Sequence, residues 1–277
     1  MTAAPAGVVL AAGAGTRLRP LTNLRPKALC PVNGIPLVEL ALERLLPSTG
    51  AGARRVAVNA HHLAEQLVSH VGGRAHVTIE QPAALGTAGA LGGLREWLDG
   101  RDVVVTNADA YLTGGVDHLV TGWDGQRCRL LVAPTEGRGD FANGTRPVRY
   151  VGMCVLPWRL VRHLKPEPSG LYEMLWRTEY ADGRIDLVRH AGTAIDCGSP
   201  SDYLAANLHA SGGRSVVGAG AVVDGIIERC VVWDHAAVAA NEHLVGCVRA
   251  GTPEAPVTVS AGDVQQARSA SPNAGQS

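Results

Sequence analysis

Lysine is almost missing from this chain of 277 residues. Lys27 and Lys165 are the only two, although the sequence holds 25 basic residues in all. They are balanced by 25 acidic residues, and a net charge of zero gives no reason to expect nucleic acid or an anionic membrane as a partner. The apolar run near the N-terminus is too short to span a bilayer and follows no basic segment, so we expect no secretion signal.

Closely spaced cysteine pairs are also missing, which excludes the Cys-x-x-Cys spacing of common zinc and redox sites. Most of the six cysteines stand among apolar residues, so we expect reduced core thiols in a cytoplasmic protein. They are Cys30, Cys128, Cys154, Cys197, Cys230 and Cys247. A hydrophobic content of 46% over this length is enough for one large core and a small appendage.

Lys27 is the first residue that we interpret as functional. The chain uses arginine almost everywhere else but keeps lysine in this loop. This choice indicates that the position needs a compact ammonium rather than a planar guanidinium. The loop starts after the strand-like run 7–12 with the small residues 13–16, whose backbone N–H groups can converge on an oxyanion. Arg17 and Arg19 follow directly. Three cations around an amide cradle suit a triphosphate.

Two other phosphate-binding motifs do not fit this loop. The dinucleotide fingerprint fails because Leu18 stands at the third glycine position and no acidic residue ends a second strand about 20 residues further on. A Walker A loop requires Gly-Lys-Ser/Thr, and neither lysine has that context. By itself, Gly-x-Gly after a strand is often only a tight turn.

The longer segment resembles a known family. Gly13-x-Gly15-Thr16-Arg17-Leu18-x-Pro20-Leu21-Thr22, followed by Pro26-Lys27 and Pro31-Val32, is similar to the signature of the sugar-1-phosphate nucleotidyltransferases, or NDP-sugar pyrophosphorylases. The resemblance implies that Arg17 and Lys27 are catalytic: Arg17 holds the departing pyrophosphate, and Lys27 bridges the α-phosphate and the acceptor phosphate. It also implies nucleotide contacts at Leu10, Ala11, Ala12, Gly13, Gly15 and Thr16.

Strand-like and helix-like segments alternate along the first part of the chain. Beyond the first strand, we expect strands at 55–59, 76–80 and 102–106 and helices over 37–46, 62–71 and 87–98. This order predicts an α/β fold with a Rossmann-like, mostly parallel sheet covered by helices on both faces. The ligand site is then expected in the loops at the carboxyl ends of the strands.

A second motif follows the strand at 76–80. Glu80-Gln81-Pro82 leads into the run 85–91 (LGTAGAL), which resembles the family loop that holds the base and its ribose. Alone, the run reads equally well as a glycine-rich helix start with Thr87 as the cap. Beside the first motif, the functional interpretation is favoured, and Gln81, Gly86 and Thr87 are expected to bind the nucleotide.

Two carboxylates are expected to bind Mg²⁺. Asn107-Ala108-Asp109 follows a buried-looking strand, where a carboxylate can reach a phosphate-bound Mg²⁺, although Asp after a strand is more often a turn residue. The resemblance implies that Asp109 is a metal ligand, with Asn107 at the substrate. It implies the same for Asp196, in a stretch similar to the family motif Asp-x-Gly-Thr-Pro. Asp202 is expected to be exposed in the first turn of the next helix.

The acceptor region departs from the family pattern. Many members carry Glu-Lys-Pro there, whereas this chain has no lysine between 28 and 164 and offers Arg138, Arg146 and Arg149 instead. Asp140 lies in a Gly-Asp-Phe triplet that resembles shorter-looped members. Gly152 lies in a run that resembles the strand lining the sugar pocket. We therefore expect Asp140 and Gly152 to bind substrate and leave the sugar unassigned.

The pattern changes in the C-terminal part. Apolar residues fall six apart at Val217 and Val223, and again at Ile226, Val232, Val238 and Leu244. This spacing predicts a short left-handed β-helix, similar to the C-terminal segment of GDP-mannose-type pyrophosphorylases. We expect a catalytic domain at 1–212, the β-helix segment at 213–251 and a disordered tail at 252–277. So few rungs need cover, which favours a homo-oligomer.

The activity implied by the resemblance is transfer of a nucleotidyl group from an NTP to a sugar-1-phosphate. GTP is preferred because of the C-terminal segment, with UTP or dTTP also open. Two alternatives remain: a transferase of the same fold that activates a non-sugar or cyclitol phosphate, such as a cytidylyltransferase, and a non-catalytic subunit that binds nucleotide sugars.

Overall fold

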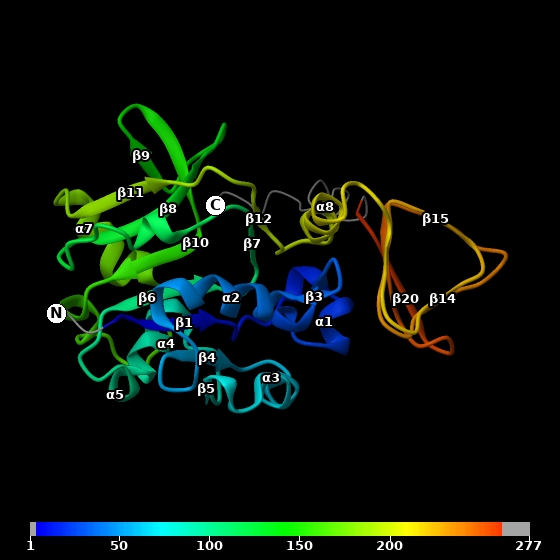
Figure 1. Ribbon diagram of the computed structural model, residues 1–277, viewed down its shortest axis with the longest axis horizontal. Coiled ribbons are helices and arrows are strands. Elements are labelled where there is room, and N and C mark those ends of the chain that lie inside the picture. The colour runs from blue at the N-terminus through cyan, green and yellow to red at the C-terminus, as the bar shows by residue number, and fades with distance from the viewer. Residues whose placement is uncertain (1–3, 262–277) are drawn as a thin grey trace, which may run out of the picture. The chain divides into compact units, whose positions relative to one another are not determined.

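Short valine-rich strands form the centre of a large sheet in the computed structural model of the protein, which describes residues 4–261 (Figure 1). The chain divides into two compact units. The first contains residues 4–14, 26–29 and 37–194, and the second contains residues 15–25, 30–36 and 195–261.

The first unit holds one eight-stranded sheet with the order β11-β8-β10-β6-β1-β4-β5, in which β9 also pairs with β10. Strand β10 runs antiparallel to β6, β8 and β9, while the other strand pairs are parallel. The mostly parallel α/β sheet expected from the sequence is therefore confirmed. The strands of this sheet are β1 (Ala6–Leu10), β4 (Val56–Ala60), β5 (His76–Ile79), β6 (Val103–Asn107), β8 (Cys128–Pro134), β9 (Phe141–Asn143), β10 (Arg146–Leu156) and β11 (Ile185–Arg189). The short β7 (Ala110–Leu112) follows β6 and is not part of this sheet.

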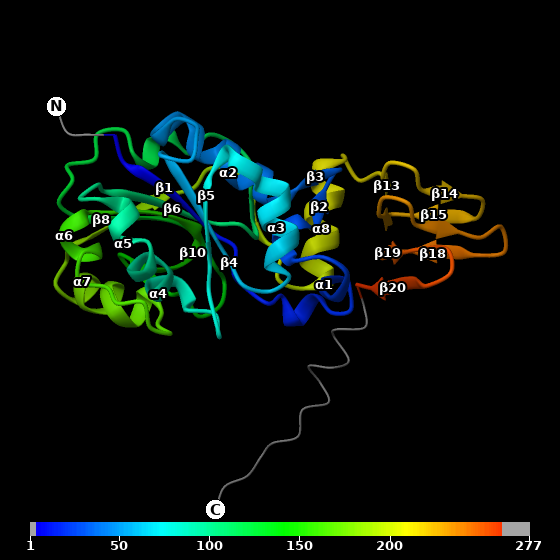
Figure 2. The ribbon, with the colours of Figure 1, turned by 90° about the horizontal axis from the view of Figure 1, so that it is seen from below.

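Helices cover both faces of this sheet (Figures 1 and 2). On one face, Val9 and Val104 pack with Leu45 and Leu67 of α2 (Leu37–Thr49) and α3 (Ala64–Val71). On the other face, Val8 packs in the cluster that holds the buried residues of α4 (Gly86–Gly93) and α5 (Arg95–Leu98). Strands buried on both sides read as continuous apolar runs, which is why VVL and VVV stand out in the sequence. The same face also receives α6 (Trp158–Val161), the π-helical turn η5 (Tyr172–Trp176) and α7 (Arg177–Ala181).

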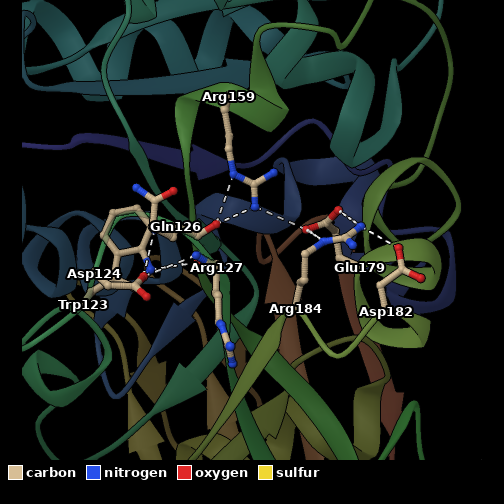
Figure 3. Close-up of polar contacts among 8 residues, drawn as sticks. All are labelled: Trp123, Asp124, Gln126, Arg127, Arg159, Glu179, Asp182 and Arg184. Atoms are coloured by element: carbon tan, nitrogen blue, oxygen red, sulfur yellow. Dashed lines mark hydrogen bonds and ion pairs between the residues drawn. The ribbon is translucent and has the colours of Figure 1, made fainter.

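A polar network holds α7 in place. The side chain of Glu179 is only 7% exposed. Its carboxylate accepts hydrogen bonds from Arg184 (2.8 Å) and Arg159 (3.4 Å), as Figure 3 shows. Arg159 also donates to the carbonyl oxygen of Gln126, and Arg184 lies 2.6 Å from Asp182. The hydrogen bond from Arg184 is the main reason why the pKa of Glu179 is lowered. This network ties α7 to α6 and to the loop before β8.

The second unit is built around α8 (Pro200–Ala210). Its Tyr203 hydroxyl donates to the carbonyl oxygen of Pro31, and Asn207 accepts from the backbone N–H of Asn33 (2.9 Å). These contacts attach α8 to the hairpin of β2 (Pro31–Val32) and β3 (Ile35–Pro36). The compact units therefore separate at 194, and not at the predicted boundary of 212, because α8 packs within the second unit.

The loop 15–25 is also part of this unit and contacts its C-terminal strands. The guanidinium of Arg25 stacks on Trp233, 4.2 Å from the ring centroid, and lies 3.8 Å from Asp234. Trp233 is 1% exposed, and its indole N–H donates to the Tyr203 hydroxyl (3.0 Å). The loop, α8 and the C-terminal strands thus share one buried aromatic centre. The loop holds η1 (Thr16–Leu18) and α1 (Leu21–Leu24).

The C-terminal strands pair in parallel, β13 with β16 and β16 with β19, β14 with β17, and β15 with β18, and Figure 2 shows them in successive layers. Their core contains Val223, Ile227, Val232, Val238 and Leu244. The predicted phase is wrong at Ile226, which is 59% exposed while Ile227 packs inward, because one residue along a strand changes the face. The strands are β13 (Val216–Val217), β14 (Val222–Val223), β15 (Ile226–Glu228), β16 (Val231–Val232), β17 (Ala237–Val238), β18 (His243–Val245), β19 (Cys247–Gly251) and β20 (Pro256–Ser260), preceded by β12 (Ala194–Asp196).

The predicted disordered tail begins too early. Strand β20 pairs antiparallel with β19, from Pro256 opposite Gly251 to Ser260 opposite Cys247. The alternating run PVTVS places Val259 inward and so continues the sheet. The remainder of the predicted tail, 262–277, lies outside the described residues.

All six cysteines are buried and none forms a disulfide, as expected for core thiols. Within residues 4–261, no helix combines the length and the apolar character needed to cross a bilayer.

Candidate active site

A cavity of about 210 Å³ opens at the carboxyl ends of β1, β4 and β6 in the first unit. Both sequence motifs contribute to its wall, the first through residues 10, 12 and 13 and the second through residues 84, 86 and 87. Its lining consists of Leu10, Ala12, Gly13, Asn59, Ala84, Gly86, Thr87, Asn107 and Asp109. Two loops that are more than 70 positions apart in the sequence therefore meet at the edge of the sheet where parallel α/β folds bind ligands.

The Lys27 ammonium forms an ion pair with the Asp109 carboxylate in this unit. Lys27 begins the short turn η2 (Lys27–Leu29) and is 8% exposed, whereas the Asp109 side chain is one-third exposed and faces the cavity. A charge at such a depth is costly unless it is paired, so the contact fixes both side chains. Lys27 was singled out as catalytic and Asp109 as a metal ligand, and the structure brings them together over 82 positions of sequence.

The two glycines of the first motif differ in their structural requirements. Gly13 lies in the cavity wall, and a Cβ there would meet nothing within 4 Å, which leaves room for a ligand. Gly15, in the second unit, has φ of 59°, a left-handed conformation that glycine adopts without strain. Its carbonyl oxygen accepts from the hydroxyl of Thr22 (2.9 Å) and from the backbone N–H of Leu18 (2.9 Å).

Arg17 lies in η1 of the second unit, directly after the exposed Thr16. Its guanidinium is 3.6 Å from the carboxylate of Asp196, and the two side chains are 60% and 56% exposed. An ion pair this exposed contributes little to stability. Asp202, expected on the surface of the following helix, is exposed in the first turn of α8, where its backbone N–H is capped by Ser199 (3.2 Å).

Gly152 lies where β10 passes close to the end of β6. It has φ of 91°, and a Cβ there would lie 2.7 Å from the Cβ of Ala110 and 3.4 Å from that of Asn107. The pairing of β10 with β8 shifts register at this point, between Tyr150 and Cys154. Gly152 therefore lets the strand approach the turn that carries Asn107 and Asp109.

Asp140 uses a carboxylate oxygen to accept from the backbone N–H of Tyr150 (2.8 Å), which fixes the start of the same irregular stretch. Next to it, Phe141 is buried among Tyr172, Trp176 and Tyr180. The chain's one phenylalanine is thus a core residue.

The three arginines expected to replace the missing lysine are arranged differently. Arg149 donates to the carbonyl oxygen of Ala194 (2.7 Å) and is partly buried. Arg138 and Arg146 are exposed. The two exposed arginines are therefore the better placed to meet a phosphate from solvent.

The second motif serves two purposes. Gly86 and Thr87 line the cavity, while Gln81 is exposed and is not part of the lining. The Thr87 hydroxyl accepts from the backbone N–H of Leu171 (2.8 Å), so it does not cap its own helix. The alternative interpretation of Thr87 as the helix cap is wrong, because the hydroxyl binds another segment.

The glycines of α4 form a face against the backbone of residues 165–169. A Cβ at Gly86 would lie 2.6 Å from the carbonyl oxygen of Ser169. A Cβ at Gly89 would overlap the carbonyl group of Glu167, and one at Gly92 would overlap that of Lys165. These glycines permit close backbone packing, and the helix expected over 87–98 is divided at Leu94 into α4 and α5.

Sequence reasoning assigned no individual role to two polar residues beside the cavity, although Glu80 opens the second motif. Asn59 ends a buried strand and is 3% exposed, and Glu80 follows the next strand and is 5% exposed. Neither belongs to a phosphate motif. The available signal was a polar residue at the carboxyl end of each strand, in positions where apolar residues would otherwise be expected.

The acidic side chains fit a divalent cation that arrives with a phosphate ligand. Among the described residues, no group of three or more His, Cys, Asp or Glu side chains lies together. Mg²⁺ usually binds proteins through one or two carboxylates and takes its other oxygens from phosphates and water. The cavity-facing carboxylate of Asp109 supplies such a hard oxygen ligand.

Comparisons with known proteins agree with this geometry. The profile of the MobA-like NTP transferase domain matches residues 7–223. N-acetylmuramate alpha-1-phosphate uridylyltransferase of Caulobacter vibrioides is 31% identical over 238 residues, which cover 72% of this chain and 94% of that protein. A Sulfolobus acidocaldarius protein named as a mannose-1-phosphate guanyltransferase is 25% identical over 231 residues, 73% of this chain and 62% of that protein.

Among solved structures, mannose-1-phosphate geranyltransferase of Thermus thermophilus has a TM-score of 0.70 at 19% identity, and the match covers 95% of this chain and 97% of that one. This similarity shows a shared fold. Since the family profile covers most of the sequence and the Caulobacter relative aligns over nearly its whole length, the chain belongs to the MobA-like NTP transferase family, among the sugar-phosphate nucleotidyltransferases.

Proposed function

We propose that this enzyme transfers a uridylyl group from UTP to a sugar-1-phosphate and releases pyrophosphate. The observation that carries the proposal is the ion pair of Lys27 with Asp109, whose carboxylate lines a cavity built from the phosphate motif and the base motif. A cavity of about 210 Å³ is smaller than most complete ligand sites, so it accommodates part of a nucleotide.

The reaction needs orientation and charge neutralisation. An oxygen of the acceptor phosphate forms a new bond to the α-phosphorus of the NTP, and the bond from that phosphorus to the β-phosphate oxygen breaks, so pyrophosphate leaves with the electron pair. A phosphate monoester is already a nucleophile at neutral pH, so no general base is required. The protein contributes fixed positive charge where negative charge develops.

The residues of this chain are proposed to act as follows. Lys27 exchanges part of its contact with Asp109 for oxygens of the α-phosphate and the acceptor phosphate. Arg17, whose side chain is mostly exposed, binds the departing pyrophosphate. Gly13 leaves space for the phosphates, and Thr87 and Gly86 border the base and its ribose.

Members of this family typically use a divalent metal, and we propose Mg²⁺ with Asp109 as its ligand in the first unit. Asp196, the other carboxylate expected to bind the ion, lies in the second unit. When bound there, such an ion would supply positive charge that offsets the charge on the reacting phosphates. Lys27 then holds the Asp109 carboxylate in place through their ion pair.

The choice of base rests on the relatives. The C-terminal segment favoured GTP, and the guanylyl relative supports it, but this chain covers only 62% of that protein. The uridylyl relative is more similar and is covered to 94%, so we place UTP first and GTP second. Shorter matches to thymidylyl and cytidylyl enzymes keep dTTP and CTP in the test.

A second acceptor class is favoured by one observation. A 2-aminoethylphosphonate cytidylyltransferase of Lancefieldella rimae is 42% identical over 59 residues, which cover 21% of this chain. Because the family lysine of the acceptor loop is missing here, a phosphonate or phosphocholine is the alternative acceptor, with CTP as the donor.

The assay that tests the function measures pyrophosphate release with each of five NTPs against a panel of sugar-1-phosphates, phosphocholine and 2-aminoethylphosphonate. UTP with a sugar-1-phosphate is expected to give the highest kcat/KM, and omission of Mg²⁺ is expected to stop release. Release only with CTP and a non-sugar phosphate would replace the proposal with the alternative. No release with any pair would overturn both.

We further propose a cytoplasmic homo-oligomer in which the C-terminal strands form a short left-handed β-helix. The buried thiols support a reducing compartment. Four aliphatic side chains of the C-terminal strands, Val217, Val222, Ile226 and Val245, are each 49–59% exposed, which supports an interface there. Light scattering of the full chain and of a chain ending at Ala210 measures the oligomeric state. An unchanged oligomer after truncation would refute an interface at the C-terminal strands.

A further inference from the structure

A buried hydrogen-bonded pair connects the two loops that line the cavity. The side-chain oxygen of Asn59 accepts from the backbone N–H of Ala11 (2.6 Å), and its amide nitrogen donates to Glu80 Oε1 (2.7 Å). Glu80 Oε2 in turn accepts from the backbone N–H of Leu85 (2.7 Å). Three hydrogen bonds thus link the end of β1 to the start of α4 through the ends of β4 and β5.

The polarity of this chain of contacts is fixed at both ends. A backbone N–H can only donate, so Asn59 presents its oxygen to Ala11 and its NH₂ group to Glu80. The Glu80 carboxylate accepts from two donors at once, which suits an ionised carboxylate. The arrangement therefore specifies both residue types.

Fold stability alone is a weak reason for this pair. The two side chains are 3% and 5% exposed, and apolar residues of similar size in such positions are often as stabilising as a buried polar pair. Both ends of the pair reach loop residues next to the cavity lining, Ala11 beside Leu10 and Ala12, and Leu85 beside Gly86. Asn59 itself is part of the lining.

We propose that Asn59 and Glu80 are positioning residues that hold the phosphate loop and the base loop at the separation that the nucleotide requires. This inference rests on the proposed function of the cavity as the nucleotide site. Its consequence is selective: the pair sets the affinity for the NTP and leaves the affinity for the sugar phosphate unchanged.

The experiment reverses the polarity of the pair. In Asn59→Asp, a carboxylate faces Glu80, and the two must share a proton to keep their contact, so NTP binding is expected to weaken at least about 10-fold and to recover as the pH is lowered. In Glu80→Gln, one carboxylate oxygen becomes an NH₂ group that faces a donor, with a similar loss.

The double variant Asn59→Asp, Glu80→Gln restores every hydrogen bond. The new carboxylate at position 59 accepts from the backbone N–H of Ala11 and from the NH₂ group of the new glutamine at position 80. The oxygen of that glutamine accepts from the backbone N–H of Leu85. The affinity of the double variant for the NTP is therefore expected to lie within about 3-fold of the wild type.

The matched control is Asn207→Asp, which places the same change at a buried asparagine of α8 that is 0% exposed and accepts from Asn33. It is expected to lower the unfolding midpoint without changing the Kd of UTP or GTP. Calorimetric titration measures these Kd values with UTP and GTP as the probes, steady-state kinetics gives KM for each substrate, and circular dichroism checks folding. Should a single variant fail to fold, Asn59→Ser, which is shorter and loses the contact with Glu80, takes its place.

Recovery in the double variant, together with a KM change confined to the NTP, would support the positioning role. Equal changes in both KM values, or a double variant as weak as the two single losses combined, would overturn it. Normal NTP binding in every folded variant would also overturn it. The proposed function fails separately, when the wild-type protein binds none of the NTPs or releases no pyrophosphate with any acceptor.

Discussion

Replacement of Lys27 tests the proposed chemistry most directly. The ammonium is 8% exposed and is held beside Asp109, so a phosphate oxygen that reaches it interacts in a partly desolvated environment. Two unit charges about 4 Å apart at an effective dielectric constant of about 20 interact with about 4 kcal/mol. Because the ammonium gives up part of its contact with Asp109, we take a smaller value of about 2.7 kcal/mol, which corresponds to a loss of about 100-fold in turnover. Lys27→Ala is therefore expected to lower kcat by at least that factor.

Lys27→Arg is expected to lose as much, because a planar guanidinium does not fit the position of a buried ammonium. The chain itself provides the control, since Lys165 is the other lysine, its side chain is 74% exposed and it lies 3.8 Å from Glu167. Lys165→Ala is expected to leave kcat within about 2-fold of the wild type, as for most surface substitutions.

The assay is pyrophosphate release at saturating NTP and sugar phosphate, with the urea unfolding midpoint measured for each variant. A folded Lys27→Ala or Lys27→Arg enzyme with near-normal kcat would refute the catalytic role. Equal losses in the Lys27 and Lys165 variants would indicate a general effect of removing charge.

Three further predictions concern packing, the metal and pH. Gly92→Ala is expected to destabilise the protein by about 1–3 kcal/mol, because its Cβ would overlap the carbonyl group of Lys165. Gly93→Ala is expected to be neutral or slightly stabilising, because its Cβ would have only a side-chain atom 3.8 Å away. Equal urea midpoints for the two variants would contradict the packing argument. Asp109→Asn and Asp196→Asn are each expected to raise the Mg²⁺ concentration for half-maximal activity. If both carboxylates serve one ion, the double variant is expected to raise this concentration by less than the product of the two single increases. Additive effects in the titration would indicate that the two carboxylates do not share an ion. Glu179→Gln is expected to lower the free energy of unfolding by about 1–3 kcal/mol at pH 7. Since the folded-state pKa of Glu179 is lowered by Arg184, this difference is fully present above the ordinary carboxyl pKa. It is expected to be lost as the pH falls from there through the lowered folded-state pKa, so a pH-independent difference would argue against it.

The parallel sheet was predictable because its strands are buried on both faces and therefore appear as short apolar runs between turn residues. The phosphate motif also located the cavity, because its glycines follow the first strand directly. The contact between Lys27 and Asp109 was not predictable, since no local pattern relates residues 82 positions apart. Both residues could nevertheless be expected at the site, because loops that follow parallel strands meet at one edge of the sheet.

The errors have identifiable causes. The strand at 256–260 alternates Val with Thr and Ser, a readable pattern that the polar composition of the surrounding tail obscured. The inward phase at Ile226 and Ile227 was ambiguous because two identical side chains are adjacent. The pairing of Asn59 with Glu80 was overlooked because a buried hydrogen-bonded pair has no sequence period.

The stacking of Arg25 on Trp233 bears on how short a fragment of this chain could be and still catalyse the reaction. Arg25 closes the loop that carries Arg17, and Trp233 lies among strands that were expected to serve only assembly. A fragment ending at the predicted domain boundary of 212 would retain Arg17 and lose the indole, so the loop would lose both its cation–π contact and the ion pair with Asp234. We therefore expect the minimal catalytic unit to extend through Trp233, and changes in the C-terminal strands to alter reaction rate as well as assembly.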